Sequence, residues 1–149
     1  MHQLDRADFE NLLAFRTGLR RFLHWSQTQA QAAGLTPAQH QLLVAIKGHP
    51  GGQPPTVGDL AGYLLLRHHS AVELVDRAVA AGLVRRCPDP DDGRVTRVGL
   101  TADGESRLAR LAPAHLDELR ELAPVLDHLI SGWAAHTAGR SAQPPVTRP

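Results

Sequence analysis

The run TVGDLAGYLLLRHHSAVELVDRAVAAGLVRRCPDPDDGRVTRVGLT, residues 56–101, passes from helical to strand periodicity within one short stretch. Its first half predicts a helix from residue 57 to about residue 63, for which Thr56 supplies an N-cap. A second helix is predicted over residues 67–81, because its apolar positions follow the 3.6-residue period and Gly82 ends it. Two short helices with a tight connection form a helix-turn-helix candidate.

The second half of the run predicts a β-hairpin. Residues 83–87 and 95–100 have strand character, and the second segment alternates in its side chains. The turn-forming residues PDPDDG, 88–93, lie between them and give the hairpin a polar tip. A hairpin placed directly after a helix-turn-helix is a wing.

Longer helices are predicted before this run. Apolar side chains recur at helical spacing from Asp8 to about Ala33, which indicates one long amphipathic helix. A second helix begins at Pro37, with Thr36 as its cap, and continues to about Lys47.

The chain is also predicted to be helical after the run. Thr101 caps a region in which apolar residues alternate spacings of three and four as far as Trp133, the pattern of a packing seam. Pro113 predicts a kink and Pro124 a break, because proline disfavours helix at the preceding residue. The polar, proline-rich tail from Ala138 is predicted to be disordered.

Composition limits the classes of protein. The 149 residues, 42% of them hydrophobic, suit a single compact domain and leave no room for a second, catalytic one. The formal net charge of +1 gives no reason by itself to expect a nucleic-acid partner. A single cysteine excludes an intramolecular disulfide framework and favours the cytoplasm. Because no apolar run approaches the ~20 residues that span a bilayer, we expect no membrane partner.

Four segments in fixed order carry a resemblance: LVDR (residues 74–77), AGLVRR (81–86), DPDDGR (89–94) and GLTADG (99–104). Together with the helix pair and the hairpin, they make the chain, over roughly residues 8–130, similar to the MarR (multiple antibiotic resistance regulator) family of bacterial winged-helix transcription factors. The resemblance implies a mainly α (α+β) fold. It would be a winged helix-turn-helix with a small β-hairpin wing, flanked by N- and C-terminal dimerisation helices.

This fold gives each part of the chain an expected task. Residues 1–35 would be the N-terminal dimerisation helix, 36–100 the winged helix-turn-helix DNA-binding lobe and 101–137 the C-terminal dimerisation helices, with 138–149 as the disordered tail. The resemblance implies a homodimeric repressor that binds a pseudo-palindromic operator in double-stranded DNA. A small aromatic or phenolic effector would release it. Neither an enzyme activity nor a cofactor is expected.

The start of the second short helix holds the predicted base-reading residues, because the N-terminal residues of a recognition helix reach base edges and phosphates. Arg94 at the hairpin tip is suited to a narrow minor groove, whose potential attracts guanidinium groups. The predicted DNA-contacting residues are Thr56, Arg67, His68, His69, Ser70, Glu73, Arg77 and Arg94.

Two of these residues have an alternative, structural role. Thr56 is a helix cap, a phosphate ligand or both, and Arg77 is either a phosphate contact or an ion-pair partner of Asp89 or Asp92.

The chain also departs from the family pattern at three positions. Relatives often carry arginine at position 91 or 93 and arginine or another donor at position 73, where this chain has Asp91, Gly93 and Glu73. The wing is therefore expected to offer fewer arginine contacts to DNA than the wings of such relatives.

Sensing residues are less clearly marked. His24, Trp25 and His115 are candidates for an effector pocket by resemblance, or are core or interface residues. Cys87 is a packed, inert thiol or a peroxide sensor. The nine histidines invite a metal-sensing alternative, but no His-x-x-x-His pair or other ligand spacing is present, so no metal site is predicted.

Functions of other classes remain as alternatives. A winged helix can serve as a protein–protein interaction module without DNA binding, and a metal- or redox-sensing regulator of the same family is a further possibility. The sequence has no nucleophile elbow, P-loop or dinucleotide fingerprint to support a small enzyme.

Overall fold

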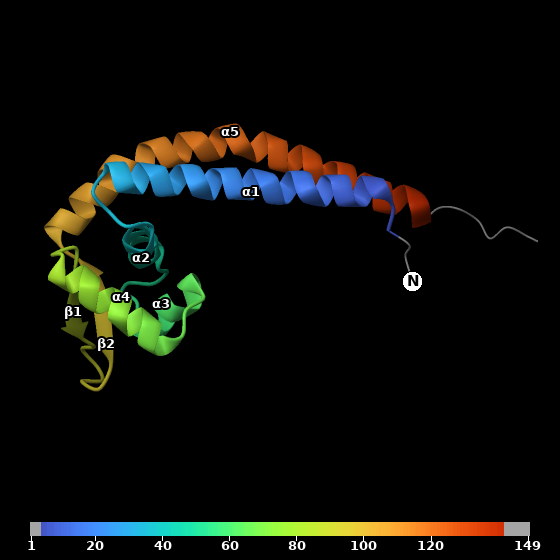
Figure 1. The fold of residues 1–149 in the computed structure, drawn as a ribbon. Helices are drawn as coiled ribbons and strands as arrows, with labels where there is room; N and C mark the ends of the chain where they lie inside the picture. Colours follow the sequence, from blue (N-terminus) through green and yellow to red (C-terminus); the bar gives the residue numbers. More distant parts are fainter. Residues whose placement is uncertain (1–3, 142–149) are drawn as a thin grey trace, which may run out of the picture. The chain divides into compact units, whose positions relative to one another are not determined.

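The computed structural model describes residues 4–141, with side chains for residues 4–135 (Figure 1). It contains two compact units, one formed by the described parts of residues 1–25 and 114–149 and the other by residues 26–113. No helix among the described residues is long and apolar enough to cross a membrane. The elements along the chain are α1 (Arg6–Ala32), α2 (Pro37–Gly48), α3 (Val57–Leu64), α4 (His68–Ala80), β1 (Val84–Pro88), β2 (Thr96–Leu100) and α5 (Ala102–Ser141).

The predicted mainly α winged helix-turn-helix is confirmed, and element bounds differ from the predicted ones by at most one residue over residues 36–100. Strands β1 and β2 pair antiparallel, with Val84 opposite Leu100 and Pro88 opposite Thr96. Thr36 caps α2 through a capping box, because its hydroxyl accepts the Gln39 N–H at 3.1 Å and the Gln39 side chain accepts the Thr36 N–H at 3.0 Å.

The core of the unit of residues 26–113 lies between α2, α3, α4 and the hairpin. Its largest side chains are almost completely buried, and leucine and valine fill it as the scarcity of aromatic residues requires. The following residues are less than 2% exposed: Leu42, Leu43, Pro55, Leu60, Val75, Leu83 and Val98.

The segment before α3 adds a contact that the sequence did not predict. The Val98 N–H donates to the Pro55 carbonyl oxygen at 2.9 Å, and Thr56 forms an isolated antiparallel bridge with Arg97. Residues 54–56 therefore lie along the free edge of β2, and the hairpin is tied to the start of α3.

Helix α5 is continuous through both Pro113 and Pro124, so the predicted break near Pro124 is wrong. Proline within a helix removes one hydrogen bond and costs about 3 kcal/mol or more. Packing on α1 offsets this cost on both sides of Pro124, where Leu122 and Leu126 reach within 3.9 and 4.0 Å of the Cβ position at Gly18. The helix also continues through residues 138–141, which were expected to be disordered, whereas residues 142–149 lie outside the described residues.

In the unit formed by residues 1–25 and 114–149, α1 and α5 lie side by side (Figure 1). Their contact includes an aromatic cluster in which the Trp25 and His115 ring centroids are 4.8 Å apart and Phe22 stacks on Trp25 at 6.2 Å. Near the start of α1 the two helices enclose a groove of about 220 Å³, lined largely by apolar side chains that include Phe9, Phe15 and Trp133.

Candidate nucleic-acid interface

The first helix of the helix-turn-helix, α3, begins at a capping box. The Asp59 N–H donates to the Thr56 hydroxyl at 3.1 Å, and the Asp59 carboxylate accepts the Thr56 N–H at 2.9 Å. This backbone N–H of Thr56 lowers the pKa of Asp59 below its ordinary value of 3.8, and the Thr56 hydroxyl and the nearby charges add to the effect. The predicted N-cap at Thr56 is confirmed, and the residue is half-buried at the lobe surface.

A tight turn joins α3 to α4. Leu65 adopts the left-handed conformation, with φ 53°, and is the only described residue other than glycine with positive φ. The Leu66 N–H then closes the turn on the Ala61 carbonyl at 2.9 Å. Leu65 itself is 92% exposed, so its side chain gains almost nothing from packing.

Helix α4 turns one face to the core and the other to solvent. Ala71, Leu74, Val75 and Ala78 are buried, as the 3.6-residue period predicts. Arg67 occupies the N-cap position without a side-chain cap bond, because a guanidinium has no acceptor for the N–H groups of the first turn. The predicted contact residues Arg67, His68, His69, Glu73 and Arg77 are all exposed, and Ser70 is half-buried.

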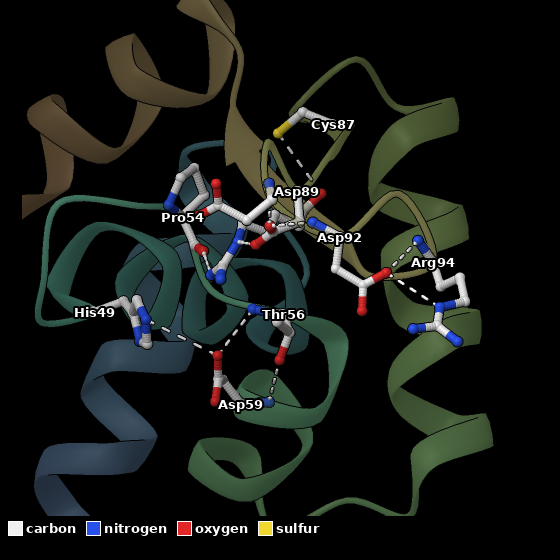
Figure 2. A network of polar contacts seen from close by, with 10 residues as sticks. His49, Pro54, Thr56, Asp59, Cys87, Asp89, Asp92 and Arg94 are labelled. Carbon is white, nitrogen blue, oxygen red and sulfur yellow. Dashed lines mark hydrogen bonds and ion pairs between the residues drawn. The ribbon is translucent and has the colours of Figure 1, made fainter.

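The wing tip is organised by carboxylates (Figure 2). Asp89 accepts the backbone N–H groups of Asp91 at 2.8 Å and Asp92 at 3.0 Å. Asp92 in turn accepts the backbone N–H of Arg94 at 3.0 Å and lies 3.2 Å from its Nε. The Arg94 side chain is 92% exposed, so its guanidinium is oriented at its base and open to a partner.

The ion pairs of the lobe differ from those considered from sequence. Asp89 pairs with Arg97 at 2.5 Å and Asp92 with Arg94, so neither of these carboxylates holds Arg77. The exposed Asp76 instead pairs with Arg86 of β1 at 2.5 Å. Arg77 therefore remains exposed on α4, as a phosphate contact requires.

Sequence reasoning missed a polar network behind the wing. Arg97 connects Asp89 with the Pro54 carbonyl, which its Nη1 contacts at 2.7 Å. His49 contacts the Tyr63 hydroxyl through Nδ1 at 2.8 Å. Its Nε2 lies 3.9 Å from the Asp59 carboxylate, a contact that Figure 2 shows. These partners are separated by between 8 and 43 residues, and no local pattern marks such pairs.

The candidate effector residues lie in the other unit. Trp25 and His115 are both half-buried and contact each other in an edge arrangement, as the aromatic cluster shows. His24, the third candidate, is exposed on α1. The structure thus brings two of the three together.

The described residues do not form a site for either alternative, peroxide sensing by Cys87 or metal sensing by histidines. The half-buried Cys87 places its Sγ 3.7 Å from the Arg97 carbonyl oxygen, inside the hairpin. No group of three or more His, Cys, Asp or Glu residues that could hold a metal ion occurs in the part of the chain that the structure describes.

A comparison with family models matches residues 33–95, from the end of α1 through the helix-turn-helix to the wing, to the model described as MarR family. Over these residues the chain is therefore similar to the MarR family. The family's members are transcriptional regulators and not enzymes.

Two curated relatives agree with the MarR family match. An uncharacterized HTH-type transcriptional regulator, YsmB of Bacillus subtilis, is 33% identical over 67 residues, 45% of this chain and 46% of that protein. The transcriptional activatory protein BadR of Rhodopseudomonas palustris is 33% identical over 101 residues, 66% of this chain and 58% of that protein. The chain thus matches about half the length of these relatives.

Solved structures of the MarR family show the same fold. AbsC from Streptomyces coelicolor aligns with a TM-score of 0.70 at 22% identity, over 93% of this chain and 99% of that one. Sco3205 from the same organism, in complex with DNA, gives 0.69 at 23% identity, over 97% and 92%. A mutant MarR from E. coli, complexed with operator DNA, gives 0.63 at 20% identity, over 86% and 90%.

Proposed function

We propose that this chain is a member of the MarR family and a homodimeric, sequence-specific DNA-binding regulator, in its simplest form a repressor. One observation carries the proposal: the start of α4 presents exposed hydrogen-bonding side chains at positions 67–69, in the same unit as an exposed arginine on the wing. This is the arrangement by which a winged helix reads base edges with a helix and backbone with a hairpin. Two structures of similar fold hold DNA.

The individual residues divide by the kind of contact they offer. Arg67, His68, His69 and Ser70 can donate to base acceptors or phosphates, and Glu73 can accept from a cytosine amino group. Thr56 and Arg77 would contact phosphates. Arg94 would enter the adjacent minor groove, where its guanidinium meets the negative potential.

Affinity for DNA should depend on where these groups lie and not on the net charge of the lobe. Over residues 56–100, the helix-turn-helix and the wing, the arginines and the carboxylates are equal in number, so this part of the DNA-binding lobe has no net positive charge. Non-specific binding should therefore be weak, and affinity should depend strongly on salt through the few phosphate contacts.

The second part of the proposal is a homodimer formed through residues 1–35 and 101–137. Its support is an unusual number of large apolar side chains that are exposed on α1 and α5, since single soluble chains rarely leave so much apolar surface uncovered. A two-fold dimer would place two α4 helices about one helical turn of DNA apart, on a pseudo-palindromic site. The exposed apolar residues of α1 and α5 include Phe9, Leu12, Leu13, Leu19, Leu23, Leu116, Leu119, Val125, Ile130 and Trp133.

The third part concerns release. We propose that a small aromatic or phenolic effector binds near His24, Trp25 and His115, supported by the aromatic contact between the last two. An effector that binds better to the conformation unable to hold DNA shifts the population toward it by that difference in affinity. The cytoplasm, where the operator and a lone free thiol would both be found, is the proposed compartment.

The test is genomic footprinting with the purified protein, followed by fluorescence anisotropy on the recovered site. We expect a pseudo-palindromic footprint, and His69→Ala should change base preference, whereas Arg110→Ala on α5, outside the helix-turn-helix and the wing, should not. A stable complex with another protein, without any footprint, would show that the chain is a protein-interaction module instead.

A further inference from the structure

Arg97 of β2 lies where three segments of the lobe meet. Its Nε pairs with the Asp89 carboxylate at 2.5 Å, and its Nη1 donates to the Pro54 carbonyl at 2.7 Å. Its backbone forms the isolated bridge with Thr56. One side chain therefore joins the wing strand, the root of the wing turn and the segment that leads into α3.

The contacts continue from Arg97 to the wing tip. Asp89 is 8% exposed and holds the turn through the N–H groups of Asp91 and Asp92. Asp92 then fixes the backbone and Nε of Arg94. The Arg97 guanidinium is the cation that neutralises Asp89, and its hydrogen bond is the main reason that the pKa of Asp89 is below its ordinary value.

The contacts also continue from Arg97 to the helix-turn-helix. Pro54 precedes Pro55, whose carbonyl accepts the Val98 N–H at 2.9 Å, and Thr56, whose hydroxyl caps α3. The guanidinium of Arg97 thus connects the segment that leads into α3 with Asp89, the residue that holds the wing turn. Each end of this connection leads to a proposed DNA contact, Thr56 at one end and Arg94 at the other.

We propose that Arg97 is a positioning residue for operator binding, which fixes Arg94 relative to the helix-turn-helix and does not itself contact DNA. This proposal rests on the proposed function. Nε and Nη1 of the guanidinium already bind Asp89 and Pro54, and the side chain is 22% exposed, against 92% for Arg94. An arginine so occupied has little capacity left for a phosphate.

The test compares operator affinity over a salt series for the wild type, Arg94→Ala, Arg97→Gln and the double variant. Loss of one cationic contact with DNA, at a phosphate or in the minor groove where Arg94 is proposed to lie, lowers the slope of log K against log salt by about one. We expect each single variant to lose about tenfold in affinity and about one unit of slope, and the double variant to lose no more than Arg94→Ala, because Arg97 acts through Arg94. Additive losses, with a slope lower by about two, would show that Arg97 contacts phosphate and would overturn the proposal.

A footprint separates positioning from a general loss of fold. In Arg97→Gln, hydroxyl-radical protection of the minor groove beside the wing should disappear, while protection of guanine N7 by α4 in the major groove should persist. Arg97→Lys, which keeps the charge but cannot span both partners, should behave like Arg97→Gln, whereas the exposed neighbour variant Arg85→Gln should match the wild type. Joint loss of both footprints in Arg97→Lys would contradict the proposal, and absence of any wild-type footprint would instead contradict DNA binding itself.

Discussion

Gly104 of α5 is the position where adding one methyl group should do the most damage. A Cβ built there would lie 2.1 Å from the Leu83 carbonyl oxygen and 3.1 Å from its carbonyl carbon. Both partners are backbone atoms, and Leu83 is 1% exposed in the core, so no flexible side chain can move aside. Gly104→Ala therefore has to push the first turn of α5 away from the junction between α4 and β1.

The contacts at this junction set the expected loss of stability in Gly104→Ala. The Thr101 N–H donates to the Leu83 carbonyl at 3.1 Å, and the Thr101 hydroxyl donates to the Gly82 carbonyl at 2.6 Å. Losing two such bonds costs about 2 kcal/mol, and overpacking adds about 1–3 kcal/mol. The free energy of unfolding should fall by about 3–5 kcal/mol, which corresponds to a drop of roughly 10–15 °C in the melting temperature for a chain of this size.

The assay is urea and thermal unfolding followed by circular dichroism. Gly62→Ala in α3 is the matched control, because nothing lies within 4 Å of its Cβ position and alanine favours a helix by about 0.5–1 kcal/mol. It should leave stability unchanged or raise it. Equal unfolding midpoints for Gly104→Ala and the wild type would refute the close approach of α5 to Leu83.

Three further predictions concern the cap, the wing and the dimer. Thr56→Ala should lower the free energy of unfolding by about 1 kcal/mol in a urea titration, whereas Thr56→Ser, which keeps the hydroxyl, should lower it much less. Equal losses in the two variants would contradict the cap. Because the pKa of Asp89 is lowered below 3.8 by Arg97, its stabilisation is present above that value and is lost as the pH falls through the folded-state pKa. Acid titration of Asp89→Asn should therefore show a weaker loss of stability below pH 3.8 than the wild type, and identical curves would argue against the ion pair. Trp133→Glu places a charge in the apolar groove of α1 and α5 and should raise the dimer dissociation constant about tenfold or more in sedimentation equilibrium, whereas an unchanged constant would exclude this surface from the interface.

Local sequence patterns were sufficient to predict most helices and caps of the DNA-binding lobe. The caps at Thr36 and Thr56 were predicted because a threonine between helix-breaking residues and a helical segment is a short-range signal. The apolar face of α4 followed from its period alone. Such features depend on neighbours within one helical turn, which the sequence displays directly.

Contacts between distant segments were not predictable in the same way. The partner of Asp89 could equally have been Arg77 from the sequence, and only the register of β2 selects Arg97. Pro124 was expected to end a helix, but packing of Leu122 and Leu126 near Gly18 outweighs its local preference. The predicted DNA and effector contacts at Arg67, His69 and Trp25 remain predictions.

Leu65 offers a simple route to a more robust protein. A left-handed conformation costs a residue with a Cβ about 1–2 kcal/mol, and this side chain, 92% exposed, recovers almost none of that in the folded chain. Leu65→Gly should therefore remove this strain and raise the free energy of unfolding without disturbing the core. A laboratory that evolves new operator preferences in α4 could begin from such a background, since most substitutions that change specificity also reduce stability.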